Sequence, residues 1–159
     1  MAYKRTKIEN APVKYRNFAG VKTQMNKEGD VNFEIILDED VAKAMMEDDW
    51  YIKVNDNNPD KIEYRIKLRL GEYGDPEVYV VGEDGKPIPF NRGQWKRLDR
   101  MTISCVDVEF HQSKKTFEYH GKEYYSAYVD LLIVNIVEND LKKKYGISAD
   151  YPDDMGLDD

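Results

Sequence analysis

Apolar and polar residues alternate with a period of two along much of the chain, which predicts β-strands. The runs are rich in tyrosine, phenylalanine and β-branched residues, and Gly, Pro, Asn and Asp bound them at hairpin-like spacing. Glycines stand where tight turns need a positive φ in 26–30, 83–86 and 120–122. The pattern therefore predicts an all-β, antiparallel, barrel-like protein. The expected strands are Val13–Phe18, Val31–Leu37, Trp50–Val54, Ile62–Leu70, Glu77–Val81, Met101–Phe110, Thr116–Tyr119 and Tyr124–Val137.

Two segments have features of a short helix. In 38–49, Val41, Met45 and Met46 form a short apolar stripe behind Asp38, which suits an N-cap. A second helix is predicted over 138–145, with lysines in its last turn and a glycine after it.

The strand predicted over 61–70 alternates most cleanly. One side of it carries Ile62, Tyr64, Ile66, Leu68 and Leu70, and the other carries Lys61, Glu63, Arg65, Lys67 and Arg69. Side chains on one face repeat at about 6.6 Å, close to the roughly 6–7 Å between phosphates of an extended single strand. This spacing favours a surface that binds single-stranded nucleic acid. The alternative is a solvated outer face whose lysines protect a sheet edge.

Other segments place rings beside cations, in 14–18, 94–97 and 114–119. Rings stack on bases and cations neutralise phosphates, neither of which needs a particular sequence of bases. Trp95 is the strongest predicted stacking residue because its stretch is irregular and carries several arginines and lysines, whereas Trp50 is expected in the core. The predicted DNA-binding residues are Lys14, Tyr15, Arg16, Lys22, Lys27, Lys61, Arg65, Lys67, Arg69, Arg92, Trp95, Lys96, Arg97 and Arg100.

The net charge of −7 is unevenly distributed. Residues 146–159 hold five of the 31 acidic side chains and no Lys or Arg, which leaves 26 acidic against 24 basic residues in the rest. No periodic apolar pattern follows Gly146. We therefore expect one domain over 1–145 and a flexible acidic tail over 146–159.

Motifs for catalysis or metal binding are not found in the sequence. It has two histidines without paired ligand spacing, one cysteine and no glycine-rich phosphate loop, so we expect no catalytic residue, metal or cofactor. The single Cys105 suits a reducing compartment. No segment resembles a signal peptide or a membrane span, so a cytoplasmic protein is expected.

Several motifs resemble a family of bacteriophage early proteins regarded as single-stranded DNA-binding proteins. They are Tyr15-Arg16-Asn17-Phe18-Ala19-Gly20, Asn26-Lys27-Glu28-Gly29-Asp30 with Asn32-Phe33, and Asp48-Asp49-Trp50 with Ile52-Lys53-Val54. The resemblance implies an oligonucleotide/oligosaccharide-binding (OB) barrel whose first hairpin loop lines the nucleic-acid face. Independently of the resemblance, we expect Asn17 and Asn32 to have a structural role, with their amides hydrogen-bonding backbone at the strand ends.

The C-terminal segment is similar to the acidic tails of bacterial and phage single-stranded DNA-binding proteins. Such tails recruit replication or recombination partners and compete with DNA for the basic groove. The residues concerned are Asp150, Tyr151, Asp153, Asp154, Leu157, Asp158 and Asp159. The chain departs from the usual pattern in ending on an aspartate rather than an aromatic residue. A merely solubilising end is the alternative.

Together these features predict a non-catalytic, sequence-tolerant single-stranded DNA-binding protein of phage replication or recombination. One alternative is a phage protein-interaction module or inhibitor of a host enzyme that does not bind DNA. Others are a virion assembly protein and, last, a nuclease with scattered carboxylates. A hairpin around 111–125 could pair two copies as a homodimer.

Overall fold

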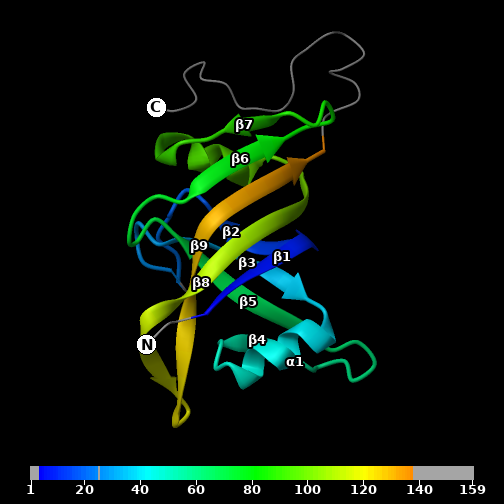
Figure 1. The fold of residues 1–159 in the computed structure, drawn as a ribbon, viewed down its shortest axis with the longest axis vertical. Helices are drawn as coiled ribbons and strands as arrows, with labels where there is room; N and C mark the ends of the chain where they lie inside the picture. Colours follow the sequence, from blue (N-terminus) through cyan, green and yellow to red (C-terminus); the bar gives the residue numbers. More distant parts are fainter. Residues whose placement is uncertain (1–3, 25, 138–159) are drawn as a thin grey trace.

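The computed structural model describes residues 4–24 and 26–137. It is mainly β, with one α-helix and one 3₁₀ helix (Figure 1). The strands are β1 Arg5–Ala11, β2 Val13–Asn17, β3 Val31–Leu37, β4 Ile52–Asn55, β5 Glu63–Leu70, β6 Glu77–Val81, β7 Pro87–Pro89, β8 Ile103–Tyr119 and β9 Lys122–Ile136. The helices are α1, Glu39–Glu47, and the 3₁₀ helix η1, Arg92–Arg100.

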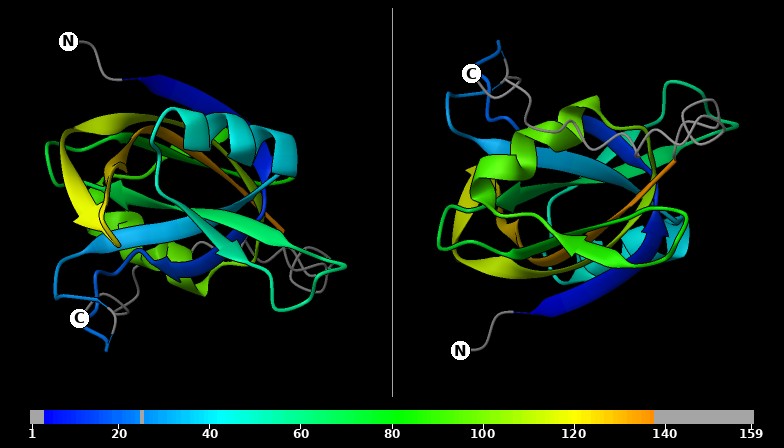
Figure 2. Two further views of the ribbon diagram at one scale, coloured as in Figure 1. Left: turned by 90° about the horizontal axis from the view of Figure 1, so that it is seen from below. Right: turned by 90° about the horizontal axis from the view of Figure 1, so that it is seen from above.

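The strands form an OB-like barrel, as predicted. Hydrogen bonds connect them in the order β1-β8-β9-β5-β3-β2, with β4 on β5 and with β6 on β9 and β7. Hydrogen bonds do not close this path, but its two end strands, β1 and β2, are separated in the chain only by Pro12. One bent N-terminal segment thus joins the two edges, and the strands curve around a common interior (Figure 2).

The core lies where the predicted periodicity places it. On β5 the side chains of Tyr64, Ile66, Leu68 and Leu70 are buried, while the intervening charged residues are partly exposed. The bounds predicted for β3 and β6 agree with the structure. Ile62 was predicted to share the buried face but is 41% exposed, because it precedes the paired part of the strand.

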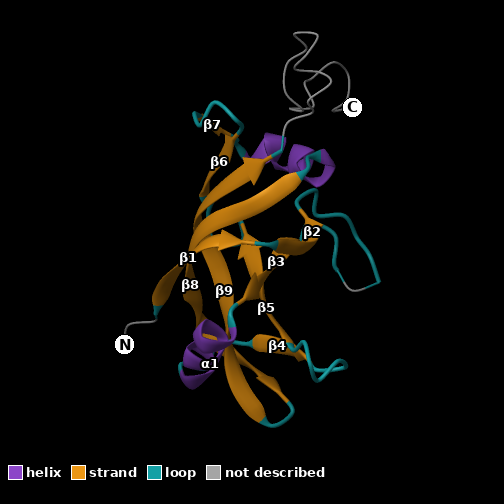
Figure 3. Cartoon of the chain, turned by 90° about the vertical axis from the view of Figure 1, so that its right-hand side faces the viewer, coloured by secondary structure: helices purple, strands orange, loops and turns teal. Residues whose placement is uncertain are grey.

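The two helices lie at opposite ends of the molecule (Figure 3). Helix α1 confirms the prediction over 38–49 and buries Ala42 and Met45, whereas Val41 of the predicted stripe is exposed. Helix η1 was not predicted; it buries Trp95 and Leu98, whose spacing of three residues matches one 3₁₀ turn. The second predicted helix lies outside the described residues. None of the helices in 4–24 and 26–137 has the length and apolarity to span a membrane.

Three strands, β1, β7 and β8, differ from the sequence-based expectation; β7, only three residues long, was not predicted. β1 was not predicted. It is an edge strand with one neighbour, β8, and its mostly charged and polar sequence lacks the apolar positions that mark a buried strand. β8 is a single strand instead of the predicted pair 101–110 and 116–119. Its pairing with β9 continues through an irregularity between Gln112 and Thr116, whose polar residues had suggested a break.

Candidate nucleic-acid interface

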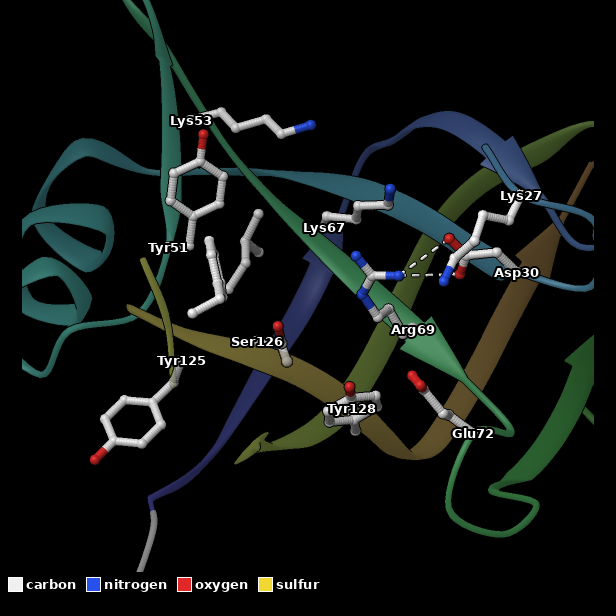
Figure 4. A pocket seen from close by; sticks show the side chains of 13 residues that line it. Lys27, Asp30, Tyr51, Lys53, Lys67, Arg69, Glu72, Tyr125, Ser126 and Tyr128 are labelled. Carbon is white, nitrogen blue, oxygen red and sulfur yellow. Dashed lines mark hydrogen bonds and ion pairs between the residues drawn. The ribbon is translucent and has the colours of Figure 1, made fainter. Parts of the chain in front are cut away.

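A groove opens where β5 changes its edge partner. Along this edge Ile66 pairs with Ile52 of β4, and Leu68 pairs in parallel with Ala127 of β9. Lys67 lies between these two pairings, so its side chain faces the space where β4 and β9 diverge. The groove has a volume of about 550 Å³. It is lined by Lys27, Asp30, Tyr51, Lys53, Ile66, Lys67, Arg69, Glu72, Phe117, Tyr125, Ser126, Ala127 and Tyr128 (Figure 4).

Four cationic side chains line this groove, and they differ in how they are neutralised. Arg69 pairs with Asp30 at 3.0 Å, and Lys53 pairs with Glu34 at 2.8 Å. Lys67 and Lys27 have no ion pair with any residue in 4–24 or 26–137. Burial, followed by the charge of Arg69, lowers the pKa of Lys67. An anion in the groove would therefore stabilise a charge that the protein leaves uncompensated.

The aromatic wall of the groove consists of Tyr51, Phe117, Tyr125 and Tyr128. Tyr51, which directly precedes β4, packs edge-on against Phe117, Tyr119 and Tyr124, with ring centroids 5.4, 5.6 and 5.2 Å away. Tyr119 and Tyr124 do not line the groove but pack behind Tyr51. Farther along β9, burial followed by the nearby Glu72 carboxylate raises the pKa of Tyr128. The Tyr128 hydroxyl is hydrogen-bonded to Glu72 and Tyr73, which holds its ring at this end of the groove.

The loop between β2 and β3 carries Lys27 to the groove, and the motif residues hold this loop. The Asn17 amide group donates to the Val21 carbonyl at 2.9 Å and accepts from the Val21 N–H. The Asn32 amide donates to the Asp30 carbonyl at 3.0 Å. These bonds confirm the structural role predicted for both asparagines. At the loop base, a Cβ on Gly20, where φ is +66°, would lie 3.2 Å from the backbone of Gly29.

Sequence and fold comparisons point to one class of protein. A family described as "Putative phage ssDNA-binding domain" matches residues 1–155. The chain belongs to this family. Among curated proteins, none matches the sequence.

Similar folds occur in the single-stranded DNA-binding protein from bacteriophage Enc34. Its structure in complex with ssDNA has a TM-score of 0.52 and 13% identity, over 85% of this chain and 88% of that chain. A C-terminal truncation of the same protein has a TM-score of 0.51 and 13% identity, over 85% and 87%. At this identity the likeness establishes a shared fold.

For this member of the phage ssDNA-binding family, the structure brings together only part of the predicted site. Lys27, Lys67 and Arg69 line the groove. Arg92 adjoins it in a hollow of about 240 Å³ that also contains Lys27 and Arg69, but its guanidinium pairs with Asp75. Other predicted cations lie outside both hollows, namely Lys14, Arg16, Lys22, Lys61, Arg65, Lys96, Arg97 and Arg100.

Trp95 was wrongly predicted to be an exposed stacking residue. Its side chain is 1% exposed within the core, and its indole N–H donates to the Phe90 carbonyl at 3.3 Å. The Arg92 guanidinium covers the ring from outside, 5.0 Å from the centroid. No base can reach Trp95 without opening the core. Tyr15, in contrast, is 64% exposed, as stacking would require, but it lies outside the groove.

Sequence reasoning missed Lys53 and the rings of Tyr51, Tyr125 and Tyr128. Each contributes through a strand pairing between distant segments, such as the bridge between Trp50 and Tyr125. Across 4–24 and 26–137, no group of three or more His, Cys, Asp or Glu side chains is placed to hold a metal ion.

Proposed function

We propose that the protein binds single-stranded DNA in the groove, without reading its sequence and without catalysing a reaction on it. Lys67 carries the proposal, because a partly buried ammonium group beside Lys53 and Arg69 lacks an ion pair among the described residues. Phosphates supply the missing negative charge. They also compete with Asp30 and Glu34 for Arg69 and Lys53.

The aromatic wall gives the groove its preference for single strands. Unpaired bases expose their faces, and stacking on a ring contributes about 1–3 kcal/mol per base for any base type. A duplex keeps its bases stacked on each other. The groove also lies on the part of an OB barrel that binds oligonucleotides, between the second and third strands and the hairpin loops. In this protein the corresponding strands are β3 and β5; of the two, β5 lines the groove, together with the loop carrying Lys27 and the β8–β9 hairpin.

The role in the cell extends this proposal. The protein acts on single strands during phage DNA replication or recombination in the host cytoplasm. Residues 146–159, beyond the domain and outside the described residues, compete with DNA for the groove through five carboxylates and recruit replication or recombination proteins. A homodimer through the exposed β8–β9 hairpin belongs to the same proposal.

A fluorescence titration with oligo(dT) tests the proposed function. We expect micromolar or tighter binding at low salt, and an affinity that falls as salt rises with a log–log slope of about −0.7 per phosphate contact. The matched duplex of the same length should bind more weakly. Constant fluorescence at about 50 mM salt, where phosphate binding remains strong, would contradict the proposal.

A further inference from the structure

A hollow of about 600 Å³, separate from the one that contains Arg92, lies next to the groove along the β8–β9 hairpin, and we call it the second hollow. The two share three lining side chains, Phe117, Ser126 and Tyr128. A DNA strand that leaves the groove across these side chains therefore enters the second hollow directly. The remaining lining residues are Tyr73, His111, Ser113, Lys114 and Lys115.

A β-bulge forms one wall of the second hollow. Between the pairs Gln112–Ala127 and Thr116–Tyr125, β8 advances four residues while β9 advances two. Ser113, only 8% exposed, fixes this bulge: its hydroxyl donates to the Lys115 carbonyl at 2.7 Å and accepts from the Ser126 N–H at 3.0 Å. Bulges redirect side chains and are frequent beside functional sites.

The bulge presents Lys114 and Lys115 to solvent. Both are exposed, and neither forms an ion pair with a residue of the described ranges. His111, which also lines the hollow, contacts the Asp130 carboxylate through Nδ1 at 2.9 Å. The second hollow thus adds two uncompensated cations to those of the groove.

An exposed ring accompanies these cations. Tyr73 is 78% exposed, and its ring packs edge-on against Tyr128 with a centroid distance of 5.0 Å. A ring exposed to this extent remains available for stacking on a base. Cations beside an available ring repeat the chemistry of the groove at a second place.

We propose that the second hollow is a second DNA subsite, in which Lys114 and Lys115 bind phosphates of a strand that continues from the groove past Phe117 and Tyr128. This inference rests on the proposed function. It adds that the bulge lysines act only on strands long enough to fill both hollows. If the two lysines were only solvated surface residues, replacing them would change the affinity equally for short and long strands.

Oligo(dT) strands of about 4 to 16 nucleotides test the subsite, since this range covers the site sizes of OB domains. The variant is Lys114→Gln with Lys115→Gln, and the matched control is Lys61→Gln with Lys86→Gln, which line neither hollow. We expect the bulge variant to bind the shortest strands like the wild type and the longest about 5–10-fold more weakly. On long strands, the log–log slope of affinity against salt should become less steep by about 1.4, which corresponds to two lost phosphate contacts. The control should match the wild type within about 2-fold at every length.

A second variant, Tyr73→Ser, keeps the test independent of the bulge. We expect the same selective loss on long strands, about 3–10-fold, because one stacking contact is removed. Thermal unfolding checks that each variant folds. Equal losses on short and long strands, or no loss at any length, would overturn the second subsite while leaving the groove intact. Failure of the wild type to bind any strand would instead remove the proposed function.

Discussion

The two halves of the outer face of β5 carry similar cations but differ in what surrounds them. In the first half, the Arg65 guanidinium contacts Glu34 at 2.8 Å and Glu63 at 2.7 Å, and Lys14 also pairs with Glu63. In the second half, Lys67 has no ion pair in the described part of the chain, and Arg69 has one, with Asp30. The first half is neutralised within the protein and the second is left partly uncompensated.

The strand pairing accounts for this difference. Glu34 lies opposite Lys67 in the β3–β5 register, yet its two carboxylate oxygens contact Arg65 and Lys53. Lys67 therefore lies beside a carboxylate whose two oxygens already form ion pairs with other residues, and Glu34 acts on it only through its charge. Where carboxylates of neighbouring segments pair with the basic side chains of a strand, those side chains stabilise the fold. Where a basic side chain has no such pair, it is available to bind a ligand. The alternation along the chain is the same in both halves.

The largest expected effect is on stability, from Glu34→Gln. The variant leaves Arg65 and Lys53 without a buried carboxylate, so the free energy of unfolding should fall by roughly 3 kcal/mol. Urea unfolding at neutral pH measures this loss. The control is Glu39→Gln, whose solvent-exposed helical pair with Lys43 contributes far less to stability. A loss as small as the control's would show that the first half of β5 is not held by its ion pairs.

The same variant should also change how the free energy of unfolding depends on pH. Burial raises the pKa of Glu34, but hydrogen bonds from Lys53 and Arg65 and their charges outweigh it, so the pKa is lowered overall. A carboxyl whose pKa is lowered on folding contributes stability above its unfolded pKa of about 4.3, and this is lost as pH falls through the folded value. Glu34→Gln should therefore lose less stability than the wild type on acidification. Parallel pH curves would contradict this account.

The next largest effect is on DNA binding, from Lys67→Glu. Reversing the uncompensated charge removes a phosphate contact and adds repulsion, so oligo(dT) affinity should fall about 10–30-fold and the salt slope by about 0.7. Lys61→Glu makes the same charge change at an exposed position outside the groove. It should lower affinity less than about 3-fold. Equal losses in the two variants would mean that net charge, rather than the second half of β5, governs binding.

Sequence reasoning predicted the parts of this comparison that depend on neighbours along the chain. The alternation of β5, its buried residues and the basic character of its other face follow directly from period-two patterning. The split into two halves does not, because Glu34, Lys53 and the rings of β9 reach β5 only through pairing of distant strands. The prediction for Trp95 was wrong for a related reason. A short 3₁₀ helix gives little periodic signal in the sequence, so the burial of Trp95 could not be recognised and the residue was predicted to be an exposed stacking residue.

A smaller effect is expected from Lys67→Met, in opposite directions for stability and binding. Burial and Arg69 lower the pKa of Lys67, so the folded state disfavours its charge and the neutral side chain should add about 0.5 kcal/mol of stability. The penalty exists below the folded pKa and fades as pH rises through it, so the gain should shrink near pH 10. Affinity for oligo(dT) should fall about 3–10-fold. Lower stability of the variant at neutral pH would contradict an uncompensated Lys67.

The smallest effect concerns residues 146–159. If the second half of β5 is where negative charge is stabilised, deleting the five acids of this segment should raise oligo(dT) affinity about 2–3-fold at low salt, and less at high salt. The same deletion in the Lys67→Glu variant should raise affinity less than in the wild type. In this variant a carboxylate already stands in the second half of β5, so the acidic segment has less positive charge to compete for. Titration of all four proteins measures this coupling directly. A gain of equal size in both backgrounds would place the competition elsewhere on the protein, and a large loss of affinity would show that the segment assists binding.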